Sequence, residues 1–423
     1  MRRRSCCFRW AFSCCFQEGC ETALSRRISL LVSLLFLCLT LSGCTGGQEI
    51  ESCLFVIAMA VDAAPDGSLT ITVKALSGTQ ESVSSSEQKN ASDNASGGSE
   101  DGENASNAAE DSEPGYIVLS ATAPSCLRAL GLLSATTPRT VNLSQLREIV
   151  LSQTIAETDA TLSILREIHS IYRANGEAVV VVTPQNAGDF IRRQHAILGL
   201  RLSKYLEVLF EHFQSIDIIP PSPNLSAVIA AMESQTIDAA AVYADGNDFD
   251  STLVLQGASD TDRLPGHLPR TAPAGNEYMG SALFSGSRMT GVLTGSETGL
   301  LCLMAGKSGT RITVIDGAQY KTRLATRSRR RIEPDGTLCV SLSLALTLTA
   351  GEQKRTSDEI AADIERSCVS VLQKLQAASC DAVGFGRIAV RAYPDIPSWE
   401  SSGWDTRYPQ AQVRVATHLK ILQ

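Results

Sequence analysis

Hydrophobic and polar positions near the start of the folded region have the spacing of a β-hairpin. The run CLFVIAMAV at 53–61 is almost wholly apolar and predicts a buried strand. The segment SLTITVKAL at 68–76 alternates and predicts a strand with one polar face. Pro65-Asp66-Gly67 lies between them and favours a tight turn. We therefore expect a hairpin over 53–76.

Helical spacing appears further along the first half of the chain. The segment 158–175 predicts an amphipathic helix whose apolar residues recur every three or four positions: Leu162, Leu165, Ile168 and Tyr172. Gly176 should end this helix. By the same reasoning we expect helices at 125–133, 187–197, 203–213 and 223–233, and strands at 116–121, 145–151 and 179–182.

Strands dominate the second half of the chain. We expect them at 279–285, 288–293, 310–315, 319–330, 337–349 and 411–422. One long helix is predicted over 356–377, with Thr356 or Ser357 as its N-cap. Its expected buried residues are Ile360, Ile364, Val371 and Leu375. The mixture predicts an α+β fold of several domains, with mixed sheets and packed helices.

An apolar run near the N-terminus predicts export. The 14 residues from Ile28 to Leu41 follow Arg26-Arg27, and as a helix they reach only about 21 Å, whereas a bilayer core needs about 30 Å. They therefore read as the apolar region of a signal peptide. Leu41-Ser42-Gly43-Cys44 has the form of a bacterial lipobox, with cleavage between Gly43 and Cys44 and acylation of the Cys44 thiol. The alternative is cleavage elsewhere, with Cys44 an ordinary thiol.

The residues before this run are unlike a signal, and we expect translation to start later, near Leu24. The predicted organisation is a signal peptide at 1–43, an N-terminal region at 44–244, a linker at 245–277 and a C-terminal domain at 278–423.

Charge is concentrated in one segment. The chain has a formal net charge of −8, and residues 81–113 hold nine acidic residues against one lysine. This segment has one valine as its only sizeable apolar residue, so we expect it to be a disordered insertion. The rest of the chain is near neutral, with no basic face to indicate nucleic-acid binding.

Cysteine and histidine positions give no metal-binding pattern. Six cysteines follow Cys44, with no CxxC pair, and no histidine lies near them at ligand spacing. We expect small buried hydrophobes, no metal and no cofactor. The sequence also lacks a P-loop, G-x-S-x-G and H-E-x-x-H, and we predict no catalytic residues. A scattered Ser-His-Asp triad stays an open alternative.

Two motifs near the C-terminus invite a functional interpretation. Residues 384–389 fit G-x-G-x-x-A, but a helix rather than a strand is expected before them, so turn glycines in a packed corner are favoured over a dinucleotide site. Trp399 and Trp404, with Tyr393 and Tyr408, could stack on a sugar or a base. Aromatic residues this dense among prolines more often hold a loop against its own core.

Two blocks of the sequence together resemble the Ger(x)C family, the C-subunit lipoproteins of spore germinant receptors. The first is FVIAMAVDAAPDGSLTITVKA at 55–75, behind the lipobox. The second, at 381–421, has an aspartate before a G-F-G turn, a Tyr-Pro and two tryptophans: Asp381, Gly384, Gly386, Tyr393, Pro394, Trp399 and Trp404. Between them, 280–307 is similar to the stretch that opens the family's C-terminal region. Thr45-Gly46-Gly47-Gln48 departs from the family's usual Trp-Asp and basic pair.

The resemblance implies a non-enzymatic subunit built of three α/β-type domains. Its implied partners are two integral membrane subunits of the receptor, one permease-like and one with a large soluble region, and its implied place is the outer leaflet of the spore inner membrane, held by a lipid anchor. Such a subunit is needed for the response to amino acids or sugars. The alternatives are a membrane-anchored solute-binding lipoprotein and an exported hydrolase.

Overall fold

The computed structural model describes residue 33 and residues 50–77, 115–171, 173–246, 264–268, 275–307, 309–310, 312–315, 317–322 and 327–422. The chain divides into two units, Met1–Ile50 and Glu51–Gln423, and the account below concerns the second. The predicted signal peptide, the lipobox and the insertion at 81–113 lie outside the described residues, as does most of the linker.

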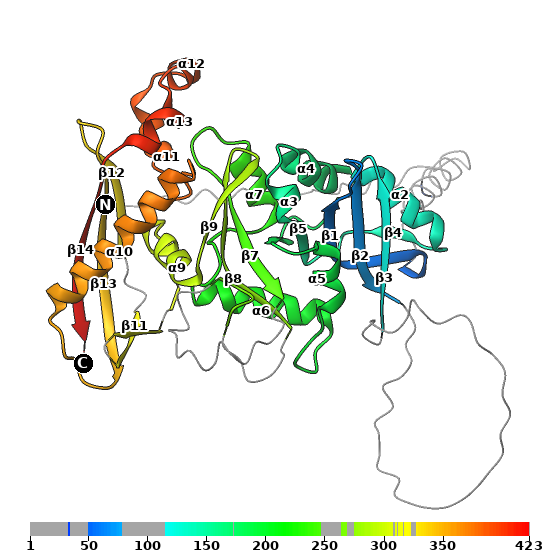
Figure 1. The fold of residues 1–423 in the computed structure, drawn as a ribbon, viewed down its shortest axis with the longest axis horizontal. Coiled ribbons are helices and arrows are strands. Elements are labelled where there is room, and N and C mark those ends of the chain that lie inside the picture. The colour runs from blue at the N-terminus through cyan, green and yellow to red at the C-terminus, as the bar shows by residue number, and fades with distance from the viewer. Residues whose placement is uncertain are drawn as a thin grey trace, which may run out of the picture. The chain divides into compact units, whose positions relative to one another are not determined.

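The first sheet is mixed and is drawn from blue to yellow-green in Figure 1. Among the described residues it has nine strands, in the order β3-β2-β1-β5-β6-β7-β8-β9 with β4 beside β1. The pairs β1–β5, β5–β6 and β6–β7 are parallel, and the outer pairs are antiparallel. The strands are β1 (Cys53–Ala63), β2 (Leu69–Leu76), β3 (Tyr116–Ala123), β4 (Thr140–Asn142), β5 (Glu148–Ser152), β6 (Val179–Thr183), β7 (Ala240–Gly246), β8 (Asn276–Ser285) and β9 (Arg288–Leu293).

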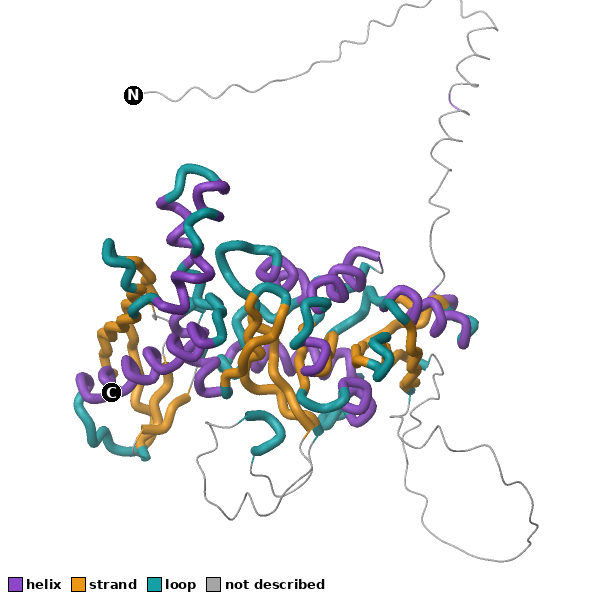
Figure 2. Tube along the Cα trace, turned by 45° about the horizontal axis from the view of Figure 1, so that its top comes forward, coloured by secondary structure: helices purple, strands orange, loops and turns teal. Residues whose placement is uncertain are grey.

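Helices cover both faces of this sheet, which is why its central strands are apolar on both sides (Figure 2). One core contains apolar residues of α2 (Cys126–Thr136), α3 (Gln153–Ala156), α4 (Thr161–Ile171) and α7 (Leu225–Met232). The opposite core contains those of α5 (Ala187–Arg193) and α6 (Leu202–Ser215). A 3₁₀ turn, η1 (Ile50–Ser52), precedes β1.

The second sheet is smaller and has helices on one face. Among the described residues its order is β10-β11-β13-β12, with β14 parallel to β13. Its strands are β10 (Ile312–Ile315), β11 (Ala318–Thr322), β12 (Arg327–Ile332), β13 (Leu338–Ala350) and β14 (Val413–Leu422). Its two longer helices are α9 (Gly295–Met304) and α10 (Ser357–Ala377). Between α10 and β14 come α11 (Gly386–Ala389), η2 (Val390–Ala392), α12 (Ile396–Glu400), α13 (Trp404–Arg407) and η3 (Tyr408–Gln410).

Several predictions from local pattern are confirmed. The α+β class with mixed sheets is correct, and β1 pairs antiparallel with β2 around a turn in which Gly67 has φ +82°. Thr356 is the N-cap of α10, and a reciprocal capping box joins it to Glu359. The six cysteines after Cys44 are all buried, as expected of small hydrophobes.

Several predicted boundaries are wrong, among them the end of the helix expected over 187–197, which is the shorter α5. The helix expected over 158–175 is the shorter α4, and Tyr172 lies outside the described residues. The strand expected over 319–330 is two strands, β11 and β12. Thr322 pairs with Leu346, and Arg327 pairs with Ser343. Residues 322 and 327 are therefore five positions apart, whereas their partners on β13 are only three positions apart. One continuous strand cannot accommodate this excess of two residues, and the alternation of side chains does not reveal it.

Candidate functional site

The structure brings most of the predicted motif together in the segment between α10 and β14. Gly43 and Cys44 lie outside the described residues, so cleavage and lipidation there stay predictions. The remaining motif residues all fall within 381–404, where the chain turns sharply and folds back on the second core.

Asp381 organises this turn through its carboxylate. Its Oδ1 accepts hydrogen bonds from the backbone N–H of Gly384 and Phe385, both at 2.9 Å, and Oδ2 accepts from that of Gly386 at 2.6 Å. The side chain is only 2% exposed, and burial raises the pKa of Asp381 to about 7, although the three donors act in the opposite direction. A buried acceptor thus satisfies three buried donors in one short loop.

The two glycines of the motif serve this turn. Gly384 has φ +84°, a left-handed conformation that side chains disfavour. A Cβ on Gly386 would lie 2.7 Å from the backbone oxygen of Thr236 and 2.9 Å from Nε1 of Trp404. The long helix α10 precedes them, and α11 after them has only four residues. The glycines are therefore packed turn residues, as predicted, and the dinucleotide geometry is absent from this described segment.

The aromatic residues pack on one another. Ring centroids are 5.5 Å apart for Tyr393 and Trp399, 5.8 Å for Trp399 and Trp404, and 5.9 Å for Trp404 and Tyr408. Trp399 and Trp404 are 4% and 9% exposed, so they offer little ring face to a sugar or base. The interpretation that they hold the loop on its core is confirmed. Pro394 is exposed and lies just before Asp395, the N-cap of α12.

Asp238, which sequence reasoning missed, joins the turn at 381–386 to the first sheet. We call this turn and the aromatic residues packed beside it the corner. Its Oδ2 accepts from the backbone N–H of Asp381 at 2.7 Å, and its Oδ1 accepts from that of Gly286 at 3.2 Å. Its own N–H donates to the carbonyl oxygen of Asp381 at 3.3 Å. Burial raises the pKa of Asp238. An acidic residue before a buried strand is too common a pattern to have identified it.

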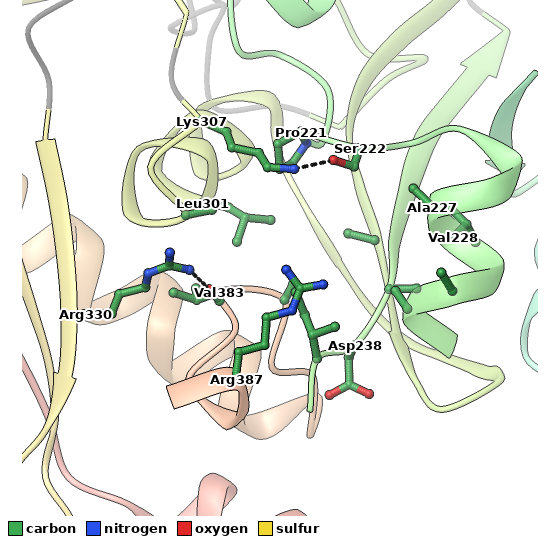
Figure 3. A pocket seen from close by; sticks show the side chains of 17 residues that line it. Pro221, Ser222, Ala227, Val228, Asp238, Leu301, Lys307, Arg330, Val383 and Arg387 are labelled. Carbon is green, nitrogen blue, oxygen red and sulfur yellow. Dashed lines mark hydrogen bonds between the residues drawn. The ribbon is translucent and has the colours of Figure 1, made fainter. Parts of the chain in front are cut away.

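A pocket of about 360 Å³ lies beside the corner (Figure 3). Its lining comes from 221–240 and from 301–387, so segments far apart in the chain form its walls. Much of the wall is apolar, with Val228, Leu301 and Val383 among its residues.

Three cationic side chains project from the walls of this pocket: Lys307, Arg330 and Arg387. Arg330 donates to the carbonyl oxygen of Val383, and burial lowers the pKa of its guanidinium. Arg330 Nη1 and Arg387 Cδ lie 3.6 and 3.7 Å from the position of a Cβ on Gly384, so the two arginines are neighbours. Arg387 also lowers the pKa of Arg330, which Asp381 raises. This arrangement of charge suits a small anion.

One pair of side chains in this pocket has the residue types of a catalytic base and nucleophile. Lys307 Nζ donates to Ser222 Oγ at 2.6 Å, which places a nucleophile beside a base. However, the side chain of Lys307 is exposed. In the described part of the chain, no group of three or more His, Cys, Asp or Glu side chains is placed to hold a metal ion. No helix there is long and apolar enough to cross a membrane.

Two family models match the chain in tandem. "Spore germination protein N-terminal domain" matches residues 46–245, and "Spore germination B3/ GerAC like, C-terminal" matches 279–423. No curated protein matches the chain. A solved structure, the crystal structure of the GerBC protein, is similar at 14% identity with a TM-score of 0.46, over 86% of this chain and 97% of that one. Since the two models together span most of the sequence in the family's order, the chain belongs to the Ger(x)C family of spore germination proteins.

Proposed function

We propose that this protein is the lipid-anchored, non-catalytic C subunit of a spore germinant receptor. Membership of the family implies a role in germination alongside other receptor subunits. The observation that most supports the finer proposal is the order of features: a lipobox at 41–44, then the N-terminal family region, then the C-terminal one. The partners we propose are a permease-like subunit and a subunit with a large soluble region.

In this proposal the lipid anchor holds the folded unit close to the membrane. Acylation of Cys44 would leave eight residues, 45–52, between the lipid and β1. A tether this short keeps the folded unit beside integral membrane partners and raises its effective concentration there without any new protein contact.

Germination of spores carrying a Cys44→Ala chain tests the proposal. We expect spores without the gene to lose dipicolinate release in response to one class of amino acids or sugars. The intact gene should restore release, and the Cys44→Ala gene should not, because the chain is no longer held at the membrane. Cys53→Ala, which removes a buried thiol nearby in sequence, is the matched control and should restore release. Full activity of the Cys44→Ala gene would contradict the anchor, and unchanged germination of the deletion to every nutrient would contradict the receptor role.

The cationic pocket favours a second candidate, a lipoprotein that binds a small solute itself. Its three cations and apolar walls suit a small organic carboxylate. Sodium butyrate should then raise the thermal unfolding temperature relative to sodium chloride at equal ionic strength. The rise should persist in Arg391→Gln, whose exposed arginine lies outside the pocket, and disappear in Arg387→Gln. An equal rise in both variants, or none in the wild type, would remove this candidate.

A further inference from the structure

The outer face of the second sheet gathers positive charge that is dispersed along the sequence. The five strands β10–β14 contain seven Lys or Arg residues and no Asp or Glu. Side chains of a strand point alternately to its two faces. On β12, Arg327, Arg329 and Arg331 are exposed, whereas Ser328 and Arg330 contact Met304 of α9 and Val383. Three arginines of one edge strand therefore share the outer face.

The register of the neighbouring strands extends this charged face. Residues paired directly across strands point to the same side of a sheet. Arg331 lies opposite Cys339, which lies opposite Arg414 of β14. In the same way Arg329 aligns with Ser341 and Ala416, and Arg327 with Ser343 and His418. Lys420 and Lys321 continue the same face opposite Ala345 and Thr347. We call the six exposed cations the basic face: Lys321, Arg327, Arg329, Arg331, Arg414 and Lys420.

The opposite side of this sheet is the one covered by helices. Leu338, Val340, Leu342 and Val415 are buried with Leu372 of α10. Figure 1 shows α10 alongside β13 and β14. The described helices of this region thus account for one face of the sheet. The other face presents small residues between long cationic side chains.

Within the described part of the chain, little of the charge on the basic face is neutralised. Glu333, in the turn after β12, pairs with both Arg331 at 3.0 Å and Arg414 at 3.4 Å. The side chains of Arg331 and Arg414 nevertheless stay 68% and 62% exposed. Such exposed pairs leave cations accessible and are weak in water. The sequence-based expectation of no basic face is therefore wrong, because strand pairing gathers cations that lie far apart in the chain.

From this geometry we infer that the basic face docks on a membrane surface rich in anionic lipid headgroups. A sheet face with cations on several strands and small residues between them presents its charges to one side, where the phosphates of a membrane surface can meet them. The inference rests on the proposed function in one respect, since a lipid anchor at Cys44 would hold the protein beside a membrane.

Vesicle binding by residues 51–423 tests the face separately from the anchor, because this compact unit lacks both Cys44 and the apolar leader. We expect it to sediment with vesicles of phosphatidylglycerol mixed with phosphatidylcholine, and not with vesicles of phosphatidylcholine alone. High salt should release it. Arg327→Gln/Arg329→Gln should weaken binding about 30-fold, at roughly fivefold for each cation near the surface.

The matched control is Arg128→Gln/Arg391→Gln, which removes the same charge from exposed positions on α2 and η2. It should bind as the wild type does, and thermal unfolding should show that both double variants are folded. Absence of binding to the anionic vesicles, or equal weakening in the two double variants, would overturn the inference. An anchored receptor subunit would still be possible in that event, since the germination test of Cys44→Ala does not depend on this face.

Discussion

Replacing Asp381 with alanine should lower the free energy of unfolding by about 3–6 kcal/mol. The carboxyl group of Asp381 accepts three backbone N–H groups within the turn, from Gly384, Phe385 and Gly386. Alanine would leave all three donors without this acceptor in a site where Asp381 itself is 2% exposed. Each buried donor left unsatisfied costs about 1–3 kcal/mol, reduced where water enters the space vacated. Urea unfolding of the wild type and the variant measures the difference.

Asp395→Ala is the matched control, because this aspartate also accepts a backbone N–H, that of Ser398 at 2.9 Å, but at an exposed helix N-cap. Water can replace its oxygen there, so we expect only a small loss of stability. Equal losses in Asp381→Ala and Asp395→Ala would mean that the corner does not depend on its buried acceptor.

The effect of Asp381→Ala should also depend on pH. Burial raises the pKa of Asp381 from 3.8 to about 7, so the folded state holds its proton more tightly than the unfolded state. Protonation of Asp381 therefore favours the folded state. Its contribution to the free energy of unfolding is fully present below pH 3.8 and is lost as the pH rises through about 7. Alanine cannot titrate. The difference between wild type and variant should therefore be larger at pH 5 than at pH 8, and an increase with pH would contradict the raised pKa.

Gly386→Ala should destabilise the protein by about 1–3 kcal/mol. The added methyl group would lie 2.7 Å from the backbone oxygen of Thr236 and 2.9 Å from the indole nitrogen of Trp404. Neither neighbour can move away easily, since one is main chain and the other lies in the aromatic cluster. The segment between α7 and β7, which contains Thr236, would have to move slightly away from Gly386. Thermal or urea unfolding measures the loss.

Gly131→Ala on α2 provides the opposite case. A Cβ there meets nothing within 4 Å, and the position is helical. Alanine should leave stability unchanged or raise it by up to about 1 kcal/mol, because it restricts the unfolded chain. A loss of stability in Gly131→Ala equal to that in Gly386→Ala would show that close packing at Gly386 is not the cause.

The elements that could be predicted from the sequence are those whose signals are local. An unbroken apolar run predicts the buried strand β1, and the Pro-Asp-Gly turn leads directly to β2. A threonine three residues before a glutamate marks the start of α10. The apolar helix α9 starts with the same signal, Thr294 three residues before Glu297, but its interior has no clear apolar period. It is buried over most of its surface, so periodicity could not separate it from a strand.

The candidate site was predictable in part. The order of five residues identified the family and located the corner: Asp381, Gly384, Gly386, Trp399 and Trp404. The two glycines could be interpreted as turn residues because tight turns require glycines. Asp238 and the cations Lys307 and Arg330 could not be found in this way. They reach the same region from other elements, and their proximity depends on how the first sheet packs against the second region.

By itself the sequence determined the class of the fold, most of its helices and strands and the family, because hydrophobic period, caps and turn residues act over a few positions. Only the tertiary structure decided which strand edges pair, that β11 and β12 are separate, and that one carboxylate closes the corner. It also decided that six dispersed cations share one face. These features follow from register and packing between distant segments, and the free energy that selects them is gained only when those segments meet.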